Sequence, residues 1–147
     1  MTILISAVGT TDPISNNRDA ALLHIARTYR PEKIVLVYSE EMLIKKDLIE
    51  QAIFSIEDYH PDVTIESTIL KNDEVYLFDK MYEVMGQIVE KHSGTDHQLI
   101  LNLSSGTPQI ISALFALNRI KINSVKVLIL MSPSLKFPRS FCNSIVR

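Results

Sequence analysis

The fold follows from the amino-terminal stretch Ile3-Leu4-Ile5-Ser6-Ala7-Val8-Gly9-Thr10-Thr11-Asp12. Its apolar run without alternation is typical of a strand buried on both faces, as in a parallel sheet. The same arrangement recurs where Leu99–Leu103 is followed by Ser104-Ser105-Gly106-Thr107-Pro108-Gln109. Parallel strands end at one common edge, where backbone N–H groups and helix dipoles favour anions. We therefore expect the two strands to be near neighbours in the sheet and their polar loops to face each other.

Outward from this stretch, strand and helix signals alternate along the chain. Apolar runs predict further strands at 33–38, 63–70, 98–103 and 124–131. Apolar residues at helical spacing predict helices over about 17–29, 40–59, 75–92 and 109–118. Strands that alternate with helices form a parallel sheet with right-handed crossovers. We predict an α/β fold, a Rossmann-like three-layer sandwich with a mainly parallel sheet, over residues 1–131, followed by an unassigned tail over 132–147.

Composition narrows the class of protein. The chain has 147 residues, 46% of them hydrophobic, which suits one globular domain with a full core. A net charge of −2 lacks the basic field of general nucleic-acid binders, so we expect no long nucleic acid as partner. The single Cys142 forms no internal disulfide, and no apolar stretch is long enough to span a membrane. These features predict a cytoplasmic protein.

The two polar loops match no common nucleotide motif. Neither carries the Gly-Lys-Ser/Thr of a triphosphate-binding loop nor the Gly-x-Gly-x-x-Gly of a dinucleotide fold. No His or Cys cluster has metal-ligand spacing, so we expect neither a metal nor a cofactor. Two interpretations remain: the loops are ordinary helix caps and turns, or their density of short hydroxyl and amide groups around a glycine binds a ligand, with Gly106 letting the backbone approach it.

The residues after each polar loop predict how the following helix begins. We expect Asn16 or Asn17 to cap the first helix, with Arg18 in its first turn, where a bound anion would explain the unfavourable position of a cation. Pro108 suits the first turn of the last predicted helix, and Thr107 is then its cap. That helix is apolar nearly all round, which predicts burial on both sides, with a second copy of the chain as one cover.

Together, the Ile5–Pro13 and Asn102–Gln109 motifs resemble the amino-terminal CARF domain of type III-A CRISPR accessory ribonucleases, CARF meaning CRISPR-associated Rossmann fold. The resemblance runs from residue 1 to about residue 130. It implies a homodimer whose two CARF domains share one pocket for a cyclic oligoadenylate, the second messenger of type III interference. It also implies that binding activates a carboxyl-terminal HEPN ribonuclease domain, for which the sequence after Met131 is too short.

The resemblance also selects candidate site residues. The predicted ligand-binding residues all lie in loops after strands or at the helix starts that follow them. They are Gly9, Thr10, Thr11, Asp12, Asn17, Arg18, Asn72, Asn102, Ser104, Ser105, Gly106, Thr107, Pro108 and Gln109. Thr107 matches the motif position linked to ring cleavage in the family. If Thr107 serves only the ligand, Thr107→Ala should leave the stability of the free protein unchanged.

Three functions remain open at this point. The first is a sensor that binds cyclic oligoadenylate, with cyclic hexa-adenylate favoured over the tetra-adenylate. The second is a slow, metal-independent ring nuclease in which Thr107 and backbone N–H groups position the phosphate for attack by the ribose 2′-OH. The third is a generic nucleotide-binding or interaction domain. Binding of cyclic oligoadenylates and cleavage of the ring separate the three.

Overall fold

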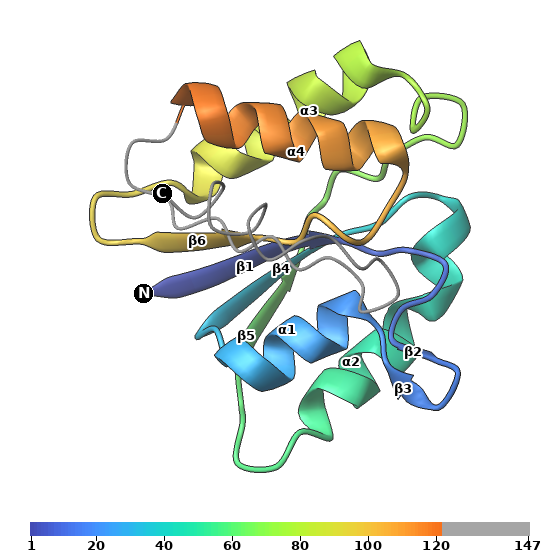
Figure 1. Ribbon diagram of the computed structural model, residues 1–147, viewed down its shortest axis with the longest axis vertical. Coiled ribbons are helices and arrows are strands. Elements are labelled where there is room, and N and C mark those ends of the chain that lie inside the picture. The colour runs from blue at the N-terminus through green and yellow to red at the C-terminus, as the bar shows by residue number, and fades with distance from the viewer. Residues whose placement is uncertain (122–147) are drawn as a thin grey trace, which may run out of the picture.

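A four-stranded parallel sheet forms the centre of the computed structural model, which describes residues 1–121 (Figure 1). The strand order is β5-β4-β1-β6, so β1 lies between β4 and β6. The strands are β1 (Thr2–Ala7), β4 (Lys33–Val37), β5 (Asp62–Ile65) and β6 (Gln98–Leu101). Ile5 pairs with Val35 on one side and with Leu101 on the other. The predicted parallel sheet and the adjacency of the first and fourth strands are confirmed.

Helices cover both faces of this sheet (Figure 1). On one face lie α3 (Phe78–His92) and α4 (Pro108–Lys121), and on the other lie α1 (Ala21–Tyr29) and α2 (Lys46–Phe54), with the 3₁₀ helix η1 (Glu41–Lys45) before α2. The predicted three-layer α/β sandwich is therefore confirmed. None of the helices within residues 1–121 is long and apolar enough to cross a membrane.

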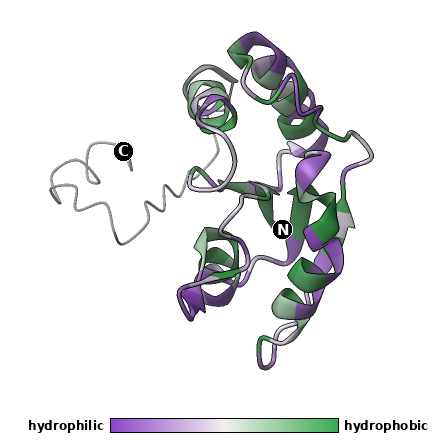
Figure 2. Cartoon of the chain, turned by 90° about the vertical axis from the view of Figure 1, so that its right-hand side faces the viewer, coloured by the Kyte–Doolittle hydropathy of each residue, from purple (hydrophilic) through white to green (hydrophobic). Residues whose placement is uncertain are grey.

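Two hydrophobic clusters explain why the central strands are apolar without alternation. Ile3 and Ile5 of β1 pack with Met81 and Leu114 in the cluster under α3 and α4. Leu4, from the other face of the same strand, packs in the cluster under α1 and α2. Figure 2 shows the strands coloured as hydrophobic between the helix layers. Each strand thus buries both faces, as the apolar runs indicate.

The region before α1 differs from the prediction. Residues 14–19 form a short antiparallel hairpin of β2 (Ile14–Ser15) and β3 (Arg18–Asp19), so the first helix begins at Ala21 and not near residue 17. Asn16 and Asn17 form the turn with φ angles of 52° and 61°. Asparagine tolerates such left-handed angles, and two consecutive ones match the twist of a hairpin. The predictions that Asn16 or Asn17 caps the helix and that Arg18 lies in its first turn are wrong.

In the second helical region the sequence predicts an apolar face of Ile44, Leu48, Ala52 and Ile56 at fourfold spacing, with Ile49 and Ile53 beside them, and only part of this set is buried. Ile44 and Leu48 are 89% and 55% exposed, whereas Ile49 and Ile53 are buried. The region begins as the 3₁₀ helix η1, which has fewer residues per turn than α2. The change of helix type shifts the phase of the apolar positions. The helix also ends at Phe54, five residues before the predicted end.

The remaining predicted elements differ in length from the prediction or fall outside the described residues: α4 is longer than expected, whereas the third strand is shorter. The third strand ends at Ile65, and Leu70 forms only an isolated bridge with Ser39. Within one chain, the last predicted helix buries Ala113 and Leu114 fully and leaves Phe115 39% exposed, and its cover by a second copy stays a prediction. The predicted strand at 124–131, the domain boundary at 131 and the tail at 132–147 lie outside the described residues.

Candidate functional site

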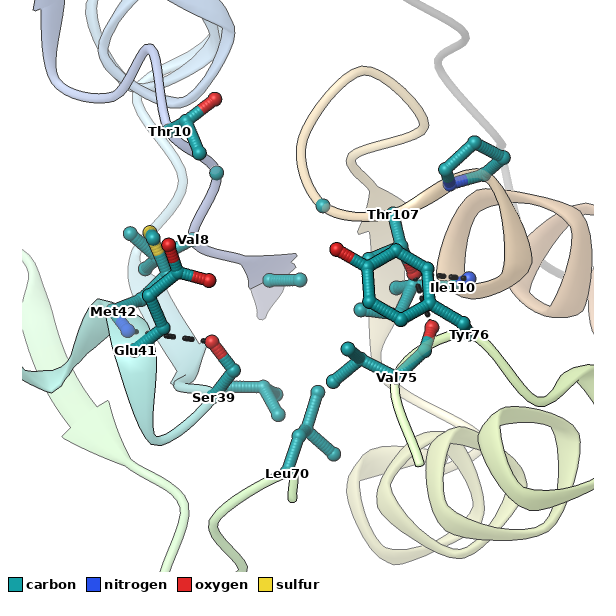
Figure 3. A pocket seen from close by; sticks show the side chains of 15 residues that line it. Val8, Thr10, Ser39, Glu41, Met42, Leu70, Val75, Tyr76, Thr107 and Ile110 are labelled. Carbon is teal, nitrogen blue, oxygen red and sulfur yellow. Dashed lines mark hydrogen bonds between the residues drawn. The ribbon is translucent and has the colours of Figure 1, made fainter. Parts of the chain in front are cut away.

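A cleft of about 240 Å³ opens at the edge where β1 and β4 end (Figure 3). Its walls come from four segments: the loop after β1, η1, the loop before α3, and the start of α4. Polar side chains of these segments line it together with apolar ones that include Val8, Met42 and Ile110. The polar ones are Thr10, Ser39, Glu41, Tyr76 and Thr107. The arrangement is that of a ligand site at the carboxyl ends of parallel strands.

The two loops predicted to face each other meet at this cleft. A Cβ atom on Gly9 would lie 3.0 Å from the backbone nitrogen of Gly106, so the loops are in backbone contact. Gly106 has a φ of +103°, and a Cβ there would lie 3.3 Å from the Cβ of Ala7 and from Cδ1 of Ile110. A Cβ on Gly106 would therefore point toward the protein interior, and the positive φ favours glycine at this position.

A buried amide fixes the start of the second loop. Asn102 is fully buried, and its Nδ2 donates to the hydroxyl oxygens of Ser6 and Ser105 at 2.9 Å each. Its Oδ1 accepts the backbone N–H of Ser104 at 2.9 Å. Ser6 in turn donates to the carbonyl of Ala7. Asn102 and Ser105 are both predicted as ligand-binding residues. In the structure, the hydrogen bonds of Asn102 connect the second loop to Ser6 of β1 on the buried side of the loop.

Asp12 performs the capping role that the sequence assigned to asparagine. Its buried carboxylate accepts the backbone N–H of Gly9 at 2.9 Å and that of Leu22, in the first turn of α1, at 3.2 Å. The residue at the N-cap position, Ala20, makes no side-chain capping bond. Asp12 therefore closes the first loop and stabilises the start of α1 at once.

Thr107 caps α4 as predicted and makes a second bond that the sequence did not indicate. Its Oγ1 accepts the N–H of Ile110 at 3.3 Å and donates to the carbonyl of Val75 at 2.6 Å (Figure 3). Val75 belongs to the loop before α3. The hydroxyl of Thr107 thus joins two walls of the cleft.

The remaining predicted residues divide into two groups. Gly9, Thr10, Gly106, Thr107 and Pro108 line the cleft. The others do not line it: Thr11, Asp12, Asn17, Arg18, Asn72, Asn102, Ser104, Ser105 and Gln109. Arg18 and Asn17 lie in the exposed hairpin.

Asn72 belongs to a contact beside the cleft. It donates its N–H to the carboxylate of Glu40 at 3.0 Å, and its Oδ1 accepts the N–H of Glu41 at 3.2 Å. Asn72 therefore holds the loop before α3 against the start of η1, whose Glu41 and Met42 line the cleft.

Sequence reasoning missed several residues of the cleft. Ser39 and Glu41 follow the predicted second strand, so the rule that selected the other loops applies to them as well. Tyr76 follows Val75 in the loop before α3, and it carried no motif. Within residues 1–121, no group of three or more His, Cys, Asp or Glu side chains is placed to hold a metal ion.

Comparison with known proteins shows close relatives. No family model matches the chain. It is 66% identical over 141 residues, 96% of its length, to the CRISPR system endoribonuclease Csm6 of Streptococcus thermophilus, and 46% identical over 134 residues, 90% of its length, to Csm6′ of the same organism. It covers 33% and 35% of these two proteins. The chain thus spans about a third of the length of the curated relatives that it matches.

A solved structure agrees with these relatives. The structure of Enterococcus italicus Csm6 bound to cyclic hexa-2′-fluoro-hexa-dAMP matches 99% of the chain and 36% of its own length, with a TM-score of 0.64 and 27% identity. Sequence similarity and structural similarity therefore identify the same group of proteins, Csm6. The resemblance of this chain to the CARF domain of Csm6-type CRISPR ribonucleases is therefore confirmed.

Proposed function

We propose that this chain is a sensor domain that binds a cyclic oligoadenylate, with cyclic hexa-adenylate as first candidate and cyclic tetra-adenylate as second, in type III CRISPR antiviral defence in the cytoplasm. The observation that carries the proposal is the contact between the Gly9 and Gly106 loops at a cleft beside the start of α4. The similarity to a Csm6 structure bound to a cyclic hexanucleotide analogue supports the class of ligand.

The chemistry of the cleft suits a phosphate-containing ligand in a chain of net charge −2. Within residues 1–121, the backbone N–H groups of Thr10, Gly106 and Thr107 donate to no acceptor, and all three residues line the cleft. Neutral N–H donors beside a helix start bind anions without a basic surface. The hydroxyls of Thr10 and Tyr76 add donors and acceptors for nucleotide groups.

The size of the cleft supports a shared site. A volume of about 240 Å³ lies below the range of about 300–1,000 Å³ typical of complete small-molecule pockets. One chain would therefore hold part of a cyclic oligonucleotide, and a second copy related by a twofold axis would hold the rest. We propose a homodimer in which the exposed Phe115 side of α4 faces the partner.

Ligand binding tests the proposal. Thermal unfolding is measured with cyclic hexa-adenylate, cyclic tetra-adenylate and linear hexa-adenylate in parallel. A ring at 100 times its dissociation constant should stabilise the fold by about 2.7 kcal/mol, and the linear control should have a smaller effect. Absence of a shift with every ring contradicts the sensor function and leaves the generic interaction domain.

Ring cleavage is the alternative activity, with Thr107 as the candidate catalytic residue. Thr107 lines the cleft, but its hydroxyl is already bonded to Val75 and Ile110. The geometry therefore supports binding better than chemistry. Chromatography of the same samples after incubation tests cleavage. The ribonuclease activity named for the relatives is a proposal for the full-length protein and is not assigned to these residues.

A further inference from the structure

We infer that Lys45 is a positioning residue that holds the Gly9–Asp12 loop in its ligand-binding shape. Its Nζ donates to the carbonyl oxygens of Thr10 at 2.6 Å, Asp12 at 2.7 Å and Gly9 at 3.4 Å. Lys45 itself does not line the cleft. The inference rests on the proposed function, because the loop matters only if the cleft binds a ligand.

The contact connects two of the segments that line the cleft, η1 and the loop after β1. Lys45 is the last residue of η1, the 3₁₀ helix that carries Glu41 and Met42. Figure 3 shows Thr10 on the same side of the cleft as Glu41 and Met42, facing Thr107 and Tyr76. The ammonium group therefore fixes the separation between the η1 wall and the loop after β1.

The carbonyl oxygens of the loop after β1 accept hydrogen bonds from Lys45, which affects the groups that remain free to bind a ligand. A lysine ammonium has three donors and no acceptor, so the three carbonyl oxygens converge on it. Asp12 holds the loop from the interior through the N–H of Gly9. With both tethers in place, the loop carbonyls are occupied, and the N–H and hydroxyl of Thr10 remain for the ligand. Without Lys45, the carbonyl oxygens of Thr10 and Asp12 would lose their donor, and their partial negative charge would oppose a bound anion.

The neighbouring Lys46 offers a matched control. It carries the same charge one position along the chain, and it is exposed. Lys45→Met and Lys46→Met change the net charge equally, so any difference between them reports the bonds to the loop. Lys45→Arg keeps a charge and several donors at the same position.

The experiment combines NMR of the free protein with calorimetric titration of cyclic hexa-adenylate. In Lys45→Met we expect shifted or broadened amide signals for Gly9, Thr10 and Asp12 and an affinity reduced by about tenfold, equal to ~1.4 kcal/mol. We expect Lys46→Met to match the wild type in both measurements, and Lys45→Arg to recover part of the affinity.

Three results would overturn the inference. They are unchanged loop signals in Lys45→Met, an equal loss of affinity in Lys46→Met, which would indicate long-range charge, and an Arg variant that binds no better than the Met variant. Failure of the wild type to bind any ring contradicts the proposed function instead. The NMR comparison of the two methionine variants still decides whether Lys45 shapes the loop.

Discussion

Gly9 and Gly106 lie so close that a Cβ atom on the first would come within 3.0 Å of the backbone nitrogen of the second. They are 97 positions apart in sequence and follow neighbouring strands. Backbone atoms yield less easily to a clash than the end of a flexible side chain. The meeting of the two loops therefore depends on the absence of a side chain at Gly9.

Gly9→Ala should disturb both stability and binding. The added methyl group must push the two loops apart, and overpacking of this kind costs about 1–3 kcal/mol. Gly86→Ala is the control, because its Cβ would meet only the end of Leu117 at 3.4 Å, in a helix where alanine is favoured by about 1 kcal/mol. Urea unfolding and calorimetric titration of both variants check this. Equal stability of Gly9→Ala and the wild type would contradict the steric argument.

The features that the sequence predicted are those with local signals. The apolar run Ile3–Val8, the loops after it and after Leu103, and the cap at Thr107 each depend on a few consecutive residues. Parallel pairing then brings the two loops to one edge without further information. The Asn16-Asn17 hairpin also had a local signal, since two such residues favour a tight hairpin turn, but the polar run was interpreted as a helix cap.

The features that the sequence could not predict depend on distant contacts. Lys45 reaches carbonyl groups 33 to 36 residues away, and Thr107 reaches Val75, 32 residues away. No periodicity or motif encodes such pairs. Fourfold spacing selected Ile44 and Leu48 as core residues because it assumed one continuous α-helix, whereas η1 and α2 differ in residues per turn.

Thr107→Ala should lower the stability of the free protein, contrary to the expectation from sequence. The variant loses the cap of α4 and leaves the carbonyl of Val75 without its donor. Loss of a threonine cap costs about 0.5–2 kcal/mol, and the lost bond to Val75 adds to it. Thr107→Ser keeps the hydroxyl and should unfold close to the wild type. Thermal unfolding without ligand measures both; a Thr107→Ala protein as stable as the wild type would show that the hydroxyl bonds contribute little.

Glu66 should make the stability of the fold depend on acid pH. It accepts from Nε2 of His92 at 2.7 Å and from Lys91 at 3.1 Å, in a buried position beside β5. Burial by itself raises the pKa of Glu66, but the bonds from His92 and Lys91 outweigh it, and the pKa lies below its ordinary 4.5. A lowered pKa stabilises the fold above about pH 4.5, and this contribution is lost as the pH falls through the lower folded-state value.

Glu66→Gln tests this contribution. At pH 7 the variant should lose about 1.5–3 kcal/mol, because a neutral amide replaces the carboxylate that accepts hydrogen bonds from His92 and Lys91. The difference from the wild type should shrink below pH 4.5, where the glutamate of the wild type also becomes protonated. Urea unfolding across this range measures the effect, with Glu90→Gln on the exposed side of α3 as control. A difference that is constant with pH would contradict the assignment to Glu66 ionisation.

The proposed homodimer gives the last prediction. Phe115 is 39% exposed on α4, seven residues after Pro108, which lines the cleft. Seven residues span about 10 Å of helix, so an interface through this side of α4 would bring two clefts near one twofold axis. Sedimentation at micromolar concentration should therefore give twice the mass of 16.7 kDa. Titration should saturate at one cyclic hexa-adenylate per two chains.

Phe115→Glu should dissociate this dimer, because a charge buried at an interface without a partner is costly. Leu48→Glu is the matched control: Leu48 is 55% exposed on α2, in the opposite helix layer, so its charge should leave the dimer intact. If the dimer forms the site, Phe115→Glu should also weaken ring binding. A wild-type chain that sediments as a monomer, or a Phe115→Glu variant that remains dimeric with full affinity, would show that the ring is not held across α4.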